Sequence, residues 1–140
     1  MIILGIETSC DETAASICSN GQILSNVVSS QSIHKSYGGV VPEMASREHE
    51  RILNSLVSYA VDEAGLCLSK IDGIAVTKGP GLAGTLLTGV CFSKGLAQGL
   101  NIPIIGINHL EAHIFAKFIE RKDMIFPYLC LLVSGGHTQI

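Results

Sequence analysis

The order of apolar and amphipathic segments is the feature that most restricts the fold of this chain. Short apolar runs with β-branched residues predict strands, and longer segments with apolar residues at helical spacing predict helices. The expected strands cover 2–6, 14–18, 22–29, 73–77, 102–107 and 128–133, with another starting at 138. The expected helices cover 42–64, 85–98 and 110–121. The order is βββαβαβα followed by strand, turn and strand, which predicts an α/β protein.

Several boundaries carry signals of their own. Asn20-Gly21 favours a tight hairpin, because both central residues of a type I′ turn need a positive φ, so three antiparallel strands are expected first. The segment 30–41 is expected to be a loop. Pro42 suits the first turn of a helix, and Gly65 and Gly99 are expected to end the first two helices.

The end of the chain resembles its beginning. Leu4-Gly5-Ile6-Glu7-Thr8-Ser9 and Leu131-Leu132-Val133-Ser134-Gly135-Gly136 both pair an apolar strand with a turn of small and hydroxyl-bearing residues. We infer a duplicated architecture in which 1–126 form a first lobe and 127–140 begin a second one. Because the sequence stops inside an expected strand, we expect the first lobe of a longer protein, truncated soon after the second lobe opens.

Composition limits the class of protein. The chain has 140 residues, 47% of them hydrophobic, which is enough for one domain with a core. Its net charge of −3 is not the footprint of a nucleic-acid-binding surface, although a partner could supply one. The five cysteines are odd in number and form no C-x-x-C, which indicates reduced thiols in a cytoplasmic protein. The uncharged run 79–93, which is rich in glycine, is too short to span a membrane.

The segment Asn108 to His113 is the strongest candidate site. It follows an apolar strand and opens a helix, where His109 and His113 lie four residues apart and share a face. Two imidazoles so placed can bind one metal ion, and ligand sites of α/β sheets lie beyond the carboxyl ends of strands. The alternative is a pair of helix histidines that bond only the backbone or solvent.

The acidic residues restrict the chemistry at this pair. Glu111 lies two positions after His109, about 200° around the helix, so this is not a zincin motif and a protease is rejected. A third carboxylate ligand would complete the two-His-one-carboxylate pattern of Fe(II), with Zn²⁺ as the alternative metal. No residue of this chain is an obvious third ligand, and Asp11 is only a distant candidate.

Three turns are candidates for phosphate binding. Ser134-Gly135-Gly136-His137-Thr138 would expose backbone N–H groups that suit phosphate, although a plain hairpin explains it equally well. Gly79-Pro80-Gly81 opens a helix but matches no P-loop, and a tight strand–helix turn is the better interpretation. Asp11 and Glu12 would repel phosphate from the turn 8–13.

Five motifs occur in order along the chain. They are Ile6-Glu7-Thr8-Ser9-Cys10-Asp11-Glu12-Thr13, Gly38-Gly39-Val40-Val41-Pro42-Glu43 with Ala45-Ser46-Arg47, Gly79-Pro80-Gly81-Leu82, His109-Leu110-Glu111-Ala112-His113 and Val133-Ser134-Gly135-Gly136-His137-Thr138. Together they resemble the tRNA adenosine threonylcarbamoyltransferase family (TsaD type), formerly described as O-sialoglycoprotein endopeptidase. The resemblance covers essentially the whole chain.

The resemblance implies a fold and a reaction. The fold would be the first lobe of the actin, sugar-kinase and Hsp70 class, which is ribonuclease H-like. The reaction would move a threonylcarbamoyl group from threonylcarbamoyl-AMP to the exocyclic amine of the adenosine beside the anticodon of tRNA. His109 and His113 would bind one divalent metal ion, usually iron, and the adenylate site would be lined by Leu132, Val133, Ser134, Gly135 and Gly136. No catalytic residue is assigned.

The resemblance also implies partners. They would be tRNA, threonylcarbamoyl-AMP, a paralogous subunit docked on the helix Pro42–Ala64, and an ATPase, in the cytoplasm and without a membrane. Family members run more than twice this length, and their third metal ligand is an aspartate outside this chain. We therefore expect these 140 residues alone to be inactive. The alternatives are a non-catalytic docking module and a small-molecule kinase, which the segment Thr8-Ser9-Cys10-Asp11 fits poorly.

Overall fold

A computed structural model of the chain describes all residues except 121–124, 126, 135–136 and 140. The strands are β1 (Ile2–Glu7), β2 (Glu12–Ser19), β3 (Gln22–Ser30), β4 (Gly73–Gly79), β5 (Ile104–Asn108), β6 (Leu132–Ser134) and β7 (His137–Gln139). The helices are α1 (Pro42–Glu63), α2 (Ala83–Leu100) and α3 (His109–Glu120), with short 3-10 helices η1 (Ser32–Tyr37) and η2 (Leu68–Lys70). The expected order βββαβαβα is confirmed.

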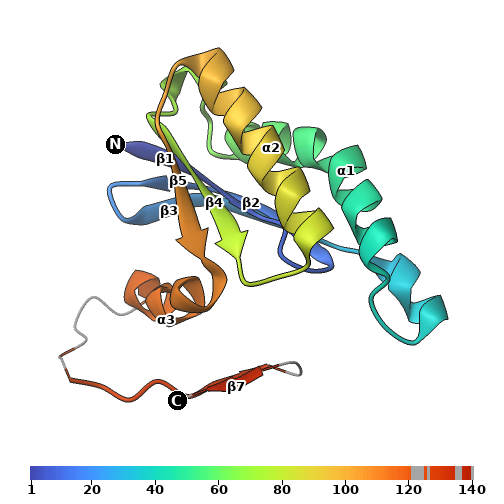
Figure 1. Ribbon diagram of the computed structural model, residues 1–140. Coiled ribbons are helices and arrows are strands. Elements are labelled where there is room, and N and C mark those ends of the chain that lie inside the picture. The colour runs from blue at the N-terminus through green and yellow to red at the C-terminus, as the bar shows by residue number, and fades with distance from the viewer. Residues whose placement is uncertain (121–124, 126, 135–136, 140) are drawn as a thin grey trace.

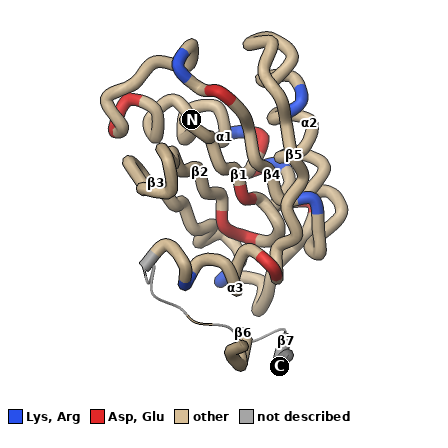
Figure 2. Tube along the Cα trace, turned by 90° about the vertical axis from the view of Figure 1, so that its left-hand side faces the viewer, with Lys and Arg blue, Asp and Glu red and all other residues tan. Residues whose placement is uncertain are grey.

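The main sheet is mixed. Its strand order is β3-β2-β1-β4-β5, with β1, β2 and β3 antiparallel and β1, β4 and β5 parallel (Figure 2). The turn between β2 and β3 is the predicted hairpin, because Asn20 and Gly21 have φ values of 50° and 79°. Since β1, β4 and β5 are parallel, their carboxyl ends meet at one edge of the sheet, and α3 lies at that edge (Figure 1).

Helices α1 and α2 cover one face of the sheet (Figure 1). The core lies between them and this face, and its residues are almost fully buried. They include Leu4, Ile6, Ala15, Ile17, Leu53, Val57, Ala60, Ile74, Val76 and Ala97. These positions recur every second residue in β1, β2 and β4, and at helical spacing in α1, as burial of a single face requires.

Some boundaries differ from prediction. The expected loop 30–41 contains the 3-10 helix η1. His34 is buried in it and its ring forms a hydrogen bond with the Gln31 side chain at 2.8 Å. This polar contact stabilises a segment that has few apolar residues. Helix α2 runs past Gly99 to Leu100 and is capped by Asn101, whose φ of 56° is left-handed. Gly65, with a φ of 68°, follows the end of α1 as predicted.

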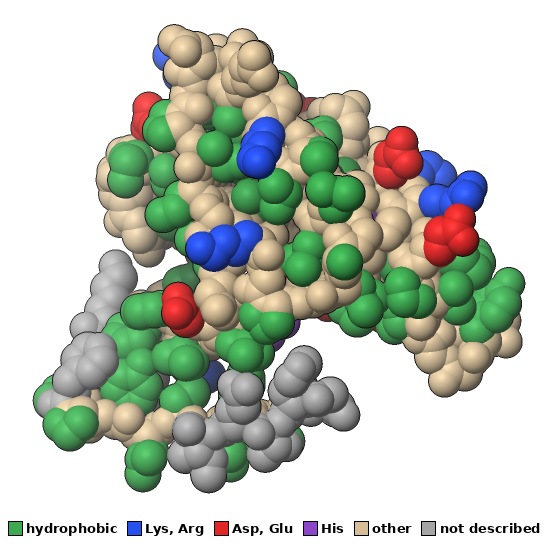
Figure 3. All heavy atoms as spheres, viewed as in Figure 1, with side chains coloured by type: hydrophobic (Ala, Val, Ile, Leu, Met, Phe, Trp, Pro, Cys, Tyr) green, Lys and Arg blue, Asp and Glu red, His purple; other side chains and the backbone are tan. Residues whose placement is uncertain are grey.

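The C-terminal part forms a second, smaller sheet. Strands β6 and β7 pair antiparallel, with Leu132 opposite Gln139 and Ser134 opposite His137. The expected strand 128–133 is wrong in its first four residues, because residues 128–131 have no strand structure. Leu129 and Leu131 are exposed there, and Figure 3 shows apolar side chains gathered over α3 and the segment that follows it.

No helix in the described part of the chain is long and apolar enough to cross a membrane.

Candidate functional site

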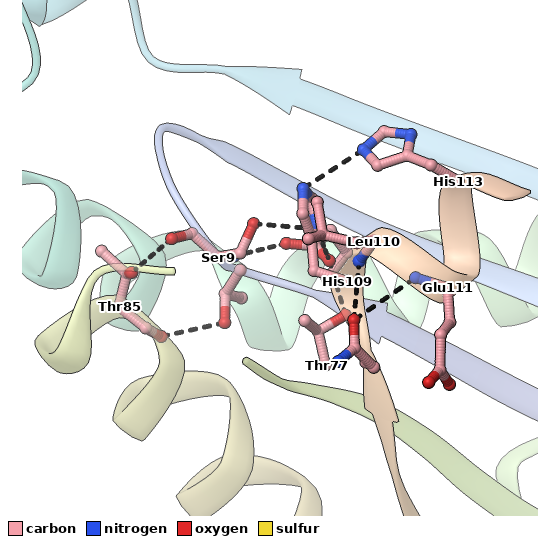
Figure 4. A network of polar contacts seen from close by, with 10 residues as sticks. Ser9, Thr77, Thr85, His109, Leu110, Glu111 and His113 are labelled. Carbon is pink, nitrogen blue, oxygen red and sulfur yellow. Dashed lines mark hydrogen bonds and ion pairs between the residues drawn. The ribbon is translucent and has the colours of Figure 1, made fainter. Parts of the chain in front are cut away.

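The candidate site lies where three parallel strands end. Glu7 is the last residue of β1, Thr77 lies near the end of β4, and His109 follows β5 directly as the first residue of α3. Figure 4 shows Thr77 and His109 close together although they come from separate elements. Glu7 and His109, 102 positions apart in the sequence, thus meet because the topology brings the carboxyl ends together.

Asn108 fixes the start of α3. Its side-chain oxygen Oδ1 accepts hydrogen bonds from the backbone N–H groups of Leu110 at 2.9 Å and Glu111 at 3.3 Å. This is an N-cap, and it satisfies donors that the first turn of a helix leaves unpaired. The cap therefore fixes the direction in which α3, which carries both histidines, leaves the sheet.

The two predicted histidines face each other. The Nε2 atoms of His109 and His113 lie 3.2 Å apart, with ring centroids 4.6 Å apart and planes at 88° (Figure 4). Two Zn–N bonds of about 2.0–2.1 Å at a tetrahedral angle separate the nitrogens by roughly 3.3 Å. The pair therefore has the spacing of two ligands on one metal ion. Their assignment as ligands stays a prediction.

Glu7 lies on the other side of the His109 ring. One carboxylate oxygen accepts the backbone N–H of Ser9, and the other accepts the Thr77 hydroxyl at 2.5 Å and faces His109 Nδ1 at 3.2 Å. Burial raises the pKa of Glu7, but the hydrogen bonds from Ser9, Thr77 and His109 outweigh it, so the pKa is lowered overall. Glu7 is therefore held as a carboxylate.

Ser9 joins this corner to α2. Its hydroxyl lies 3.2 Å from His109 Nδ1, and its carbonyl accepts the Leu82 N–H at 2.8 Å and the Thr85 hydroxyl at 3.1 Å. A Cβ on Gly81 would lie 2.6 Å from that carbonyl oxygen, so only glycine fits. Gly81 thus allows close packing and Gly79 has a positive φ of 151°, so the two glycines serve a tight strand–helix turn, the interpretation preferred from sequence.

A buried histidine holds the same turn from α1. His49 is fully buried, its Nε2 lies 3.0 Å from the Cys10 carbonyl oxygen, and its Nδ1 lies 2.7 Å from the Thr13 hydroxyl. A carbonyl only accepts, so Nε2 carries the proton and Thr13 donates to Nδ1. The apolar pattern of α1 did not reveal His49, because sequence periodicity counts a histidine as polar.

A cavity of about 440 Å³ opens beside the histidine pair. Small side chains of the sheet form much of its lining, and its polar residues are Glu7, Ser16, Asn26, Thr77, His109 and His113. This volume lies in the range of small-molecule sites. The arrangement offers two facing imidazoles, a carboxylate and room for a small group.

The other predicted site residues lie elsewhere. Among the described residues, no three His, Cys, Asp or Glu side chains are grouped to hold a metal ion, so neither Asp11 nor Glu111 completes the pair. Figure 4 shows Glu111 pointing away from both imidazoles. Leu132, Val133 and Ser134 form β6, whereas Gly135 and Gly136 lie outside the described residues.

Sequence reasoning missed Glu7, Ser9 and Thr77 as neighbours of His109. The available signal was position, since Glu7 closes one strand and Thr77 lies near the end of another. Side chains at the carboxyl ends of adjacent parallel strands lie together. Without the strand order, however, the sequence does not tell which strand lies next to β1 in the sheet.

Comparison with solved structures supports the fold. The structure described as "YeaZ from Pseudomonas aeruginosa" superposes with a TM-score of 0.67 over 86% of this chain and 49% of that one, at 22% identity. A second solved structure, described as a protein with similarity to peptidase YEAZ from Pseudomonas aeruginosa, gives a TM-score of 0.64 at 24% identity, with the same two coverages. These likenesses confirm the expected actin-like, ribonuclease H-like fold class.

Comparison of sequences shows the family. The family described as tRNA N6-adenosine threonylcarbamoyltransferase matches residues 22–140. Two curated proteins of that name, from Phocaeicola vulgatus and Chlorobium chlorochromatii, are 54% and 56% identical over 99% of this chain. The chain spans only 42% and 41% of their lengths. It therefore belongs to the TsaD family of tRNA N6-adenosine threonylcarbamoyltransferases.

Proposed function

We propose that this chain contributes the histidine pair of an enzyme that makes threonylcarbamoyladenosine in tRNA. The reaction transfers the threonylcarbamoyl group from threonylcarbamoyl-AMP to the exocyclic amine of the adenosine beside the anticodon. A C–N bond forms, the bond to AMP breaks, and the amine loses a proton. The observation that supports this function most directly is the 3.2 Å approach of His109 Nε2 to His113 Nε2 beside an open cavity, in a chain of this family.

His109 and His113 would hold one divalent metal ion, Fe(II) first and Zn²⁺ as the alternative. Such an ion acts as a Lewis acid on a carbamoyl or phosphate oxygen and orients the substrate. Glu111 is exposed and directed away from the pair. By the family resemblance, the remaining protein ligand would be an aspartate outside these 140 residues. Leu132 to Gly136 would contact the adenylate.

The surface of α1 would dock a paralogous subunit, and an ATPase would join the assembly. Its outer face carries two ion pairs, Arg47–Glu43 at 2.6 Å and Arg51–Glu48 at 2.5 Å, together with the exposed ring of Tyr59. Exposed ion pairs add little to the stability of the chain itself. They are suited to orient a partner, and an exposed tyrosine is a typical anchor residue.

A chimera tests the proposed reaction. These 140 residues would replace the corresponding part of the Phocaeicola vulgatus relative, and the product would be measured in tRNA with threonylcarbamoyl-AMP supplied. We expect modification by the chimera, its loss in His109→Ala, and its retention in Glu111→Ala. Undiminished modification by the His109→Ala chimera would contradict the proposal. Turnover by the isolated chain would overturn the expectation that it is inactive alone.

A further inference from the structure

The two nitrogens of the His109 ring face different side chains. Nε2 faces His113, whereas Nδ1 faces the Glu7 carboxylate at 3.2 Å and the Ser9 hydroxyl at 3.2 Å. A neutral imidazole carries one N–H and one lone pair, and the hydrogen bond at one nitrogen decides which is which. The groups behind Nδ1 therefore determine whether Nε2 can act as a ligand.

Glu7 favours one of the two tautomers. An ionised carboxylate only accepts hydrogen bonds, so Nδ1 must carry the proton if the contact is to be attractive. The lone pair then lies on Nε2 and points towards His113. Ser9 does not impose this choice, because a hydroxyl can donate to a bare nitrogen or accept from a protonated one.

The carboxylate is itself fixed from two sides. The backbone N–H of Ser9 holds one oxygen, and the Thr77 hydroxyl, at 2.5 Å, holds the oxygen that faces His109. The first donor lies in the turn after β1 and the second lies in β4. Strands β1 and β4 are neighbours in the sheet. The side chain of Glu7 is 31% exposed and that of His109 is 27% exposed, so water only partly competes.

We propose that Glu7 is a positioning residue that keeps His109 in the tautomer with the proton on Nδ1 and presents the Nε2 lone pair towards His113. In a metal site of this kind, a carboxylate behind a histidine orients the ring and raises its basicity. This use of Nε2 rests on the proposed function, whereas the tautomer itself is a property of the metal-free chain.

The tautomer can be measured directly. Long-range ¹H–¹⁵N spectra of the ¹⁵N-labelled, metal-free chain distinguish a protonated from a bare ring nitrogen, at a pH well above the ordinary titration range of histidine. We expect His109 of the wild-type chain to carry its proton on Nδ1. A proton on Nε2, or an even mixture, would overturn the proposal without any variant.

Two variants separate Glu7 from Ser9. In Glu7→Gln the amide N–H₂ can donate to Nδ1, so we expect the proton of His109 to move to Nε2 in most molecules. In Ser9→Ala the carboxylate remains, so we expect the wild-type tautomer. Backbone amide spectra of the β1–β4 pairs show that each variant is folded. Retention of the Nδ1 proton in Glu7→Gln, or its loss in Ser9→Ala, would overturn the proposal.

Metal affinity gives a second readout. With Zn²⁺ as the probe, we expect Glu7→Gln to bind about 10–100-fold more weakly than the wild-type chain, and Ser9→Ala to bind within about threefold of it. Equal affinity of Glu7→Gln and wild type would overturn the positioning role. If the wild-type chain binds no Zn²⁺, the metal site fails while the tautomer spectra still decide the role of Glu7.

Discussion

The Nε2 atoms of His109 and His113 lie 3.2 Å apart and are turned towards each other at the carboxyl edge of the sheet. Two neutral imidazoles can share at most one proton between these nitrogens, and an ion could replace that proton. Asn108 caps the helix below the pair, and Glu7 lies behind the first ring. The geometry of the pair is thus set by groups outside the helix as well as by the spacing of four residues.

Gly89 lets α2 approach the turn that follows β1. A Cβ at this position would lie 2.2 Å from the Thr8 hydroxyl oxygen, so Gly89→Ala should force the helix away. We expect a loss of about 1–3 kcal/mol in the free energy of unfolding, measured by urea denaturation. The matched control is Gly95→Ala in the same helix, where no atom lies within 4 Å of the new Cβ. That variant should gain about 0.5–1 kcal/mol, and an equal response of the two would contradict the packing argument.

Thr13 supplies the hydrogen bond that His49 Nδ1 needs inside the core. Thr13→Val keeps the shape but leaves a buried acceptor unpaired, which should lower the free energy of unfolding by about 1–3 kcal/mol. Thr88→Val is the control, because the Thr88 hydroxyl donates to the Gly84 carbonyl of its own helix at 3.0 Å in an exposed position. That variant should change stability by less than about 0.5 kcal/mol. Thermal unfolding of both variants compares them, and an equally small effect of Thr13→Val would argue against the buried bond.

Glu7 should make stability depend on pH in acid. Its pKa is lowered in the folded chain, so the folded state holds the carboxylate more strongly than the unfolded state does. The resulting stabilisation is complete above the ordinary carboxyl pKa and is lost as the pH falls through the lowered value. The stability difference between wild type and Glu7→Gln should therefore stay constant from pH 7 down to the ordinary carboxyl pKa and shrink below it. Urea unfolding across this pH series measures it, and a difference that grows in acid would contradict the assigned direction.

Local signals predicted most of the fold. The order of elements, the hairpin at Asn20 and the end of α1 at Gly65 follow from apolar period and from turn residues. Gly99 was a misleading signal, because the helix continues to a left-handed Asn101 that also tolerates a positive φ. η1 was missed since His34 is anchored by Gln31 rather than by an apolar pattern.

The site was predictable only where its residues are close in sequence. His109 and His113 are found from their spacing, because one helix places both. Glu7 and Thr77 reach the same ring through strand order, which the sequence alone did not determine. The adenylate-site prediction at Leu132 to Gly136 stays a prediction, since Gly135 and Gly136 are outside the described residues.

Titration of the metal-free chain with Co²⁺ or Zn²⁺ tests the central claim that the two histidines hold one metal ion. The account predicts one ion per chain and affinity losses in His109→Ala and His113→Ala larger than the roughly 10–100-fold cost of losing a supporting partner. Glu111→Ala, on the same helix but directed away, should bind as the wild type does. Unchanged affinity in either histidine variant, or an equal loss in Glu111→Ala, would contradict the account.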